Sequence, residues 1–254
     1  MIGTRLEHAA LSHEGRVRAN NEDAYCVRPA DGLFAVADGM GGHEHGEWAS
    51  AVIADALQAL PLPAGFDAAS LAVANALHQA NVTIFAEARR RGSRMGSTAV
   101  ALLVRDGRFA VLWVGDSRAY LHRDGQLVQL THDHTQVQEM IDRGLIAAAD
   151  ATGHPMSHVL ARAIGVAETV AVDVVADEVE SGDVFLLCSD GLMARVEDAE
   201  IAGVLTEPDA DTRTARLVRM TLDRGAPDNV TVVTVGIAQT TLLRFDQPVH
   251  LVTR

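Results

Sequence analysis

The chain has 254 residues and a formal net charge of −13, and its 21 Lys+Arg residues are all arginine. The absence of lysine excludes a P-loop nucleotide site, a protein kinase and a Schiff-base enzyme, because each needs a lysine amine. The acidic balance argues against nucleic acid as a partner, since a phosphate backbone requires clustered cations. Phosphate chemistry in this chain would depend on arginine, backbone N–H groups or metal.

The bulk composition predicts a globular protein of the cytoplasm. A hydrophobic share of 48% is enough for a well-buried core. Cys26 and Cys188 make no disulfide framework, and no apolar run has the length of a signal sequence or a membrane span. The one basic cluster, Arg89 to Arg91 with Arg94, surrounds Gly92 and is typical of a solvated helix C-terminus.

Hydrophobic periodicity predicts the elements of the N-terminal part. Short strands are expected over 4–11, 24–28 and 33–37, the last ending on Asp38-Gly39 before a glycine-rich turn. Apolar residues at helical spacing predict helices over 47–60 and 68–91.

The period then changes to that of strands. Runs at 97–104, 109–115, 118–122 and 126–130 flank two Asp-Gly turns and predict an antiparallel meander. The polar segment 132–165 fits a helix with an irregular flap. The remaining expected elements are strands over 170–176, 184–189 and 230–237 and helices over 197–205 and 210–224. One domain of mainly antiparallel strands covered by helices is the simplest architecture.

Acidic residues stand where the predicted strands end. Three apolar runs end on Asp38, Asp116 and Asp190, and Asp228 precedes the last strand. An ordinary turn explains the two hairpin Asp-Gly pairs, but not Asp38 or Asp190, which no return strand follows. The pattern leaves open whether the four converge. Converging carboxylates would need arginine or divalent cations, and an all-oxygen set suits Mg²⁺ or Mn²⁺ better than Zn²⁺.

The histidine and cysteine patterns favour other metal or phosphatase chemistries only weakly. His43-x-His45 and His132-x-His134 lack two further zinc ligands. Cys188 lies seven residues before Arg195, one too many for a Cys-x5-Arg phosphatase loop. An aspartyl-phosphate enzyme would need Asp-x-Asp-x-Thr, but Asp209-x-Asp211 is followed directly by Thr212 and then by Arg213. This segment is more typical of a helix start.

Together with an N-terminal block, these acids resemble the metal-dependent Ser/Thr protein phosphatases of type 2C, the PPM family, in their compact bacterial form. The resemblance covers nearly the whole chain. The motifs, in family order, are Arg-x-x-Asn-Glu-Asp at 18–23, Asp-Gly-Met-Gly-Gly-His at 38–43 with Gly46-Glu47, Gly-Ser-Thr at 96–98, Gly-Asp-Ser-Arg at 115–118, Leu-Thr-x-Asp-His-Thr at 130–135, His-Pro at 154–155, Leu-x-Arg-x-Ile-Gly at 160–165, Ser-Asp-Gly-Leu at 189–192 and Asp-Asn-x-Thr at 228–231.

The resemblance implies an α+β fold, a four-layer α-β-β-α sandwich with two antiparallel sheets face to face and helices outside. Metals would lie in a cleft at one end of the sandwich. The phosphatase domain is expected over 1–240, and the tail 241–254 could add an edge strand.

The resemblance also implies roles for particular residues. Asp38 would bridge two Mn²⁺ or Mg²⁺ ions, with Asp190 and Asp228 completing one site. The Gly39 carbonyl and, through water, Glu22 would serve the other site, and Asp23 would support that shell. Asp116 with Asp190 resembles a third, weaker metal site, and Arg18 resembles the phosphate-binding arginine.

One position departs from the animal members, which carry a histidine two residues after the bridging aspartate. Met40 stands there in this chain, as bacterial relatives commonly have it. The general acid is therefore unassigned, with His43 and a metal-bound water as candidates. His45 is expected on the surface.

The expected function is hydrolysis of phosphoserine and phosphothreonine in proteins by a metal-bridging water, opposing a bacterial Ser/Thr kinase. Two alternatives stay open. The first is a catalytically silent module that binds phosphoproteins or metal, although intact metal positions argue against it. The second is a hydrolase of the same fold that acts on small phosphoesters.

Overall fold

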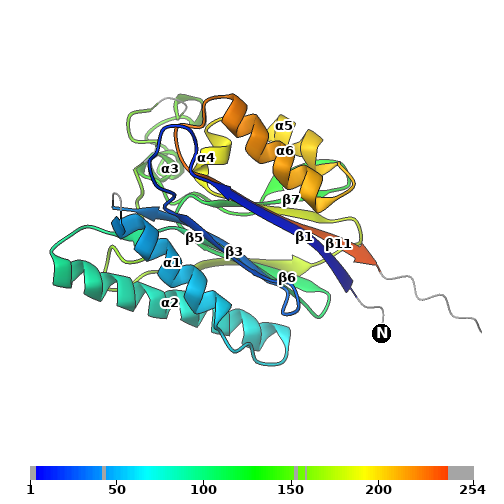
Figure 1. Ribbon diagram of the computed structural model, residues 1–254, viewed down its shortest axis with the longest axis horizontal. Helices are drawn as coiled ribbons and strands as arrows, with labels where there is room; N and C mark the ends of the chain where they lie inside the picture. Colours follow the sequence, from blue (N-terminus) through cyan, green and yellow to red (C-terminus); the bar gives the residue numbers. More distant parts are fainter. Residues whose placement is uncertain (1–3, 42–43, 152–153, 158, 240–254) are drawn as a thin grey trace, which may run out of the picture.

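Two antiparallel sheets lie face to face between two groups of helices in the computed structural model (Figure 1), which describes residues 4–41, 44–151, 154–157 and 159–239. The predicted four-layer α-β-β-α sandwich is confirmed.

The first sheet has five strands. Their order across the sheet is β1 (Thr4–His13), β11 (Val230–Gln239), β10 (Val184–Cys188), β7 (Arg118–Arg123) and β8 (Gln126–Gln129). Three helices cover its outer face and bury one apolar cluster against it: α4 (Asp190–Met193), α5 (Asp198–Leu205) and α6 (Ala210–Asp223).

The second sheet is covered by the two N-terminal helices, α1 (Glu44–Gln58) and α2 (Phe66–Arg91). Its strands are, in order, β2 (Asp23–Arg28), β3 (Leu33–Met40), β5 (Ala99–Arg105), β6 (Arg108–Val114) and β9 (Asp173–Glu178), and the short β4 (Gly96–Ser97) pairs with the end of β3. The segment between β8 and β9 carries α3 (Gln136–Asp142) and a 3₁₀ turn (Ala148–Asp150).

The strand β3 shows how the sandwich is built from its sequence. Leu33, Ala35 and Ala37 belong to the core beneath α1 and α2. Phe34 and Val36 point the other way, into the core between the sheets. Because successive side chains of a strand alternate between its faces, a strand buried on both sides must be apolar at every position.

The predicted meander is wrong in one respect. Both Asp-Gly turns form the hairpins β5–β6 and β7–β8, with Asp106 at φ 54° and Asp124 at φ 52°. However, β6 and β7 belong to different sheets. The chain crosses between the sheets after β6, where Gly115 has a φ of 106°. Periodicity shows which residues are buried, but not which strand is the partner.

Several element boundaries also differ from expectation, and one short helix is additional. β3 continues past residue 37 to Met40, because β4 pairs Ser97 with Gly39 and Gly96 with Met40. β9 starts at Asp173 instead of 170, and the short helix α4 begins at Asp190. The predicted tail 241–254 lies outside the described residues, so the domain limit at 240 and the extra edge strand stay predictions. No helix in the described ranges has the length and apolar character to cross a bilayer.

Leu77 provides a test of the packing of α2 on the sheet. Its side chain is completely buried, whereas Leu71 on the same helix is 63% exposed. Replacing Leu77 with alanine should lower the free energy of unfolding by about 2–5 kcal/mol, because a cavity remains. Leu71→Ala, the matched control, should change it by less than about 0.5 kcal/mol. Urea unfolding of both variants measures this, and equal losses would contradict the packing.

Candidate active site

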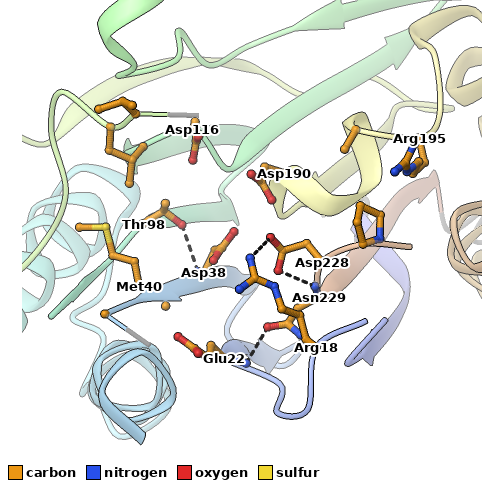
Figure 2. Close-up of a pocket in the computed structure, with 16 residues that line it drawn as sticks. Arg18, Glu22, Asp38, Met40, Thr98, Asp116, Asp190, Arg195, Asp228 and Asn229 are labelled. Atoms are coloured by element: carbon orange, nitrogen blue, oxygen red, sulfur yellow. Dashed lines mark hydrogen bonds and ion pairs between the residues drawn. The ribbon is translucent and has the colours of Figure 1, made fainter. Parts of the chain in front are cut away.

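A pocket of about 970 Å³ opens where the ends of both sheets meet, and acidic side chains surround it. Figure 2 shows five carboxylates around this cavity, each from a different part of the chain: Glu22, Asp38, Asp116, Asp190 and Asp228. The convergence that the pattern left open is therefore present. Asp23, also predicted for this site, lies behind the pocket lining.

The position of Asp38 depends on the Gly-Ser-Thr motif. The backbone N–H of Asp38 donates to Thr98 Oγ1 at 3.0 Å, and its carbonyl accepts from Ser97 Oγ at 2.9 Å and from the Thr98 N–H at 2.8 Å. Thr98 in turn contacts Ser117 Oγ at 2.6 Å, next to Asp116. The motif thus joins two of the five acids across both sheets.

Asn229 connects the loop that carries Arg18 and Glu22 to the start of β11. Its Oδ1 accepts the N–H of Glu22 at 2.8 Å, and its Nδ2 donates to the carbonyls of Glu14 and Asn20 at 2.9 Å. Sequence reasoning quoted Asn229 within a motif and gave it no role. The Asp-Asn-x-Thr motif at 228–231 is the signal in the sequence that points to it.

Glycines allow this close packing. A Cβ added to Gly46 would overlap the Glu22 carboxylate, and one added to Gly39 would overlap the Gly46 carbonyl. Only glycine at both positions lets the first turn of α1 lie against β3 and Glu22. This explains the Gly46-Glu47 pair that accompanies the motif at 38–43.

Burial and mutual repulsion make these carboxylates hard to ionise together. Burial, followed by the charges of Asp23, Asp190, Asp116 and Asp228, raises the pKa of Asp38 well above its usual range. Burial raises the pKa of Asp23 to about 7, although Ser189 Oγ and Thr231 Oγ1 each donate to its Oδ2 at 2.7 Å. Its Oδ1 is buried without a hydrogen-bond partner.

Asp116 shows the same effect, since burial and the charge of Asp190 raise its pKa to about 7. Positive charge is scarce by comparison. Of the described residues that line the pocket, only Arg18 and Arg195 are basic. Arg18 Nη2 lies 2.6 Å from Asp228 Oδ2, and this contact raises the arginine pKa. The sequence analysis assigns no role in the site to Arg195, which the structure places in the pocket lining.

The donor set fits a hard divalent cation. Within the described ranges, no three Asp, Glu, His or Cys side chains already enclose a single cation, and the carboxylates stand along the pocket walls. However, the pKa values of Asp23 and Asp38 are raised, and Asp23 Oδ1 has no hydrogen-bond partner among the described residues. The ionised carboxylates would therefore carry more negative charge than Arg18 alone balances. Carboxylate oxygens without cysteine or histidine suit Mg²⁺ or Mn²⁺.

The zinc alternative finds no support. His132 Nε2 contacts Asp142 at 2.8 Å, and His134 Nε2 contacts Asp173 at 3.1 Å, so the two rings serve separate structural contacts. His45 is half-buried, unlike the expected surface position, and its Nδ1 has no hydrogen-bond partner among the described residues. His43, the candidate general acid, lies outside the described residues.

The segment between β8 and β9 forms one wall of the pocket through Val159 and Leu160. It is anchored at both ends. Arg118 binds Asp133 through both carboxylate oxygens, and Ile164 forms a β-bridge with Ser97. The predicted flap therefore borders the carboxylates directly.

The chain is similar to known proteins over most of its length. Residues 9–140 match the family model described as Protein phosphatase 2C. The chain belongs to this family. It is 39% identical to the Ser/Thr protein phosphatase PstP of Mycobacterium tuberculosis over 91% of this chain and 45% of PstP, and so spans about half of that relative's length.

Two solved structures of the family resemble the chain over nearly its whole length. PppA, described as a key regulatory component of T6SS in Pseudomonas aeruginosa, has a TM-score of 0.86 and 39% identity, over 92% of this chain and 100% of that one. The catalytic domain of a Ser/Thr protein phosphatase PstP in complex with two manganese ions has a TM-score of 0.81 and 37% identity, over 93% and 100%.

Stability measured with and without Mn²⁺ tests the cation fit. Asp23 and Asp116 ionise near pH 4 in an unfolded chain and near pH 7 in the folded one. As pH rises across this window, the unfolded state releases protons that the folded state retains, so the carboxylates destabilise the metal-free protein progressively. The Mn²⁺-induced rise in Tm should therefore be larger at pH 7.5 than at pH 5.5.

The quantity compared is the difference in Tm between the samples with and without Mn²⁺ at the same pH. His134, whose pKa is lowered by burial, changes the Tm of both samples alike, so its contribution cancels in this difference. Differential scanning fluorimetry with Mn²⁺ or a chelator measures it. An increment that does not change with pH, or no increment, would contradict the fit.

Proposed function

We propose that this protein hydrolyses phosphoserine and phosphothreonine in phosphoproteins with Mn²⁺ or Mg²⁺. The observation that carries the proposal is the pocket itself, in which five carboxylates and Arg18 face one cavity. The names of the relatives support it, since they are Ser/Thr protein phosphatases. So does the pair of manganese ions in the similar PstP catalytic domain.

The proposed metal ligands follow the family pattern. Asp38, which lines the pocket, would serve as a ligand in both sites of a pair of ions, with Asp190 and Asp228 completing one of the two sites. The Gly39 carbonyl and Glu22 would hold the other, Glu22 through water. A third ion would lie between Asp116 and Asp190. Asp23 would orient this set, because Ser189 and Thr231 fix one of its oxygens.

Bound cations would supply an acidified water as the nucleophile and neutralise the phosphoryl oxygens. Arg18 binds the phosphoryl group, because its guanidinium fork matches two phosphate oxygens. No protein nucleophile is required. Burial raises the pKa of the Cys26 thiol to about 11 and that of Cys188 further still, which keeps both as core thiols.

The leaving group needs a proton, and Met40 has none to give. His43 and a metal-bound water remain the candidate acids. The opposing enzyme would be a Ser/Thr kinase, and the cytoplasm is the proposed compartment.

Asp38 provides the central test. Asp38→Asn should lower phosphate release from a phosphothreonine peptide at least about 100-fold, because it removes the proposed bridging charge. A chelator should abolish wild-type turnover, and Mn²⁺ should restore it. Malachite-green detection of phosphate measures both. Turnover that survives either change would contradict the two-metal mechanism, and metal binding without turnover would favour the silent module.

Arg18 tests the phosphate contact separately from the metals. Arg18→Ala should raise KM about tenfold or more while the Mn²⁺ concentration for half-maximal activity changes little. Arg18→Lys should recover only part of the loss, because an ammonium cannot make the bidentate contact.

Arg16 is the matched control, since its Nε donates to the Leu222 carbonyl outside the pocket. Arg16→Ala should leave KM unchanged. A metal titration that shifts as much as KM in Arg18→Ala would instead make Arg18 part of the metal site.

A further inference from the structure

A second recess, of about 740 Å³, adjoins the carboxylate pocket, and Met40 and Gly41 line both cavities. Its other walls come from the C-terminal end of α2, from the connection to β4, and from Gly165 and Val166 after the flap. Figure 2 shows Met40 on the side of the carboxylate pocket opposite Arg195 and Asp228. A substrate chain that passes over Met40 would therefore leave the carboxylates and enter this recess.

The recess has the opposite charge to the carboxylate pocket. Arg89 and Arg94 line it, and none of its described lining residues is acidic. The neighbouring Arg90 and Arg91 are both paired with Glu87. In the described part of the chain, neither Arg89 nor Arg94 has an ion-pair partner, although Arg89 lies over the Phe85 ring at 5.8 Å.

A helix C-terminus favours basic residues by itself, and this accounts for Arg89 to Arg91. It does not account for Arg94, which comes after the left-handed cap Gly92. Two unpaired guanidinium groups beside the same hollow, in a chain with a net charge of −13, indicate a site for an anion.

The interior of the recess offers further contacts. Ser93 also lines the recess, and its buried Oγ has no hydrogen-bond partner among the described residues. Phe85 and the 56% exposed Val166 add apolar surface to the lining. Gly165, at φ 88°, lies so close to Ile84 that a side chain would not fit. The close contact between Gly165 and Ile84 belongs to the packing of the fold at this side of the recess. The recess combines cationic groups, a hydroxyl and an apolar surface.

We propose that this recess binds an anionic side chain of the phosphoprotein substrate, close to the phosphorylated residue, and so selects acid-flanked sites. The proposal rests on the proposed phosphatase function. The anion can be a carboxylate or a second phosphate, since guanidinium binds both. Arg89 and Arg94 would act in substrate specificity and stay outside the reaction itself.

The test compares phosphothreonine peptides that differ only in their flanking residues. One has neutral flanks, others carry glutamates before or after the phosphothreonine, and others carry a phosphoserine in those places. The readout is the kcat/KM for each anionic peptide divided by that for the neutral peptide. Partial unfolding of a variant cancels in this ratio. We expect a wild-type ratio of about ten for the better anionic peptide at low salt, falling as salt screens the charges.

Three variants examine the recess. Arg94→Glu should lower the ratio about tenfold or more, because it replaces attraction with repulsion. Val166→Glu, which adds a negative charge at another residue of the lining, should lower it also, whereas Val166→Gln, which matches that variant in size and shape without the charge, should not. Arg90→Glu, at the same helix end but outside the recess, is the control for general charge and should leave the ratio unchanged.

A wild-type ratio near one would overturn the proposal. So would equal losses in Arg94→Glu and Arg90→Glu, or in Val166→Glu and Val166→Gln. If no peptide is hydrolysed, fluorescence anisotropy measures the dissociation constant of each peptide, and the affinity for the anionic peptide is divided by that for the neutral one. Anion-dependent binding that Arg94→Glu abolishes would then support the recess and reject the phosphatase, whereas turnover without anion preference would reject only the recess.

Discussion

Repulsion among carboxylates at one end of the sandwich is the constraint on which the rest of the structure depends. Burial and neighbouring charges raise the pKa values of Asp23, Asp38 and Asp116, so the protein keeps these groups together against an electrostatic cost. It does so with rigid elements. The pairing of β4 with β3 holds Asp38, the crossing between the sheets presents Asp116, and Asn229 ties Glu22 to the start of β11.

The arginines complement this negative centre. Arg18 reaches Asp228 from one loop, and Arg89 and Arg94 border the adjoining recess at Met40. With no lysine in the chain, every fixed cation near the site is a planar guanidinium, which suits phosphate and carboxylate better than a point charge does. With the proposed divalent cations bound, this end of an acidic protein would form a surface for the proposed anionic substrates.

Local patterns predicted the elements well where the chain's immediate neighbours decide the structure. The Asp106-Gly107 and Asp124-Gly125 turns form as expected, because their positive φ angles depend on those residues alone. Gly92 ends α2 for the same reason. The prediction was wrong where a distant partner decides. β3 is longer because β4 pairs with it, and β6 and β7 separate into two sheets although only a short link joins them.

The sequence by itself determined most of the element types, the exclusion of lysine chemistry, the family resemblance and the acidic residues and Arg18 as site candidates, because motif spacing and periodicity are properties of the chain. Only the tertiary structure decided that Asp38, Asp116, Asp190 and Asp228 face one cavity, that Asn229 positions Glu22, and that two unpaired arginines border a second recess. These facts depend on contacts between residues far apart in the chain, and periodicity carries no information about which distant segments meet.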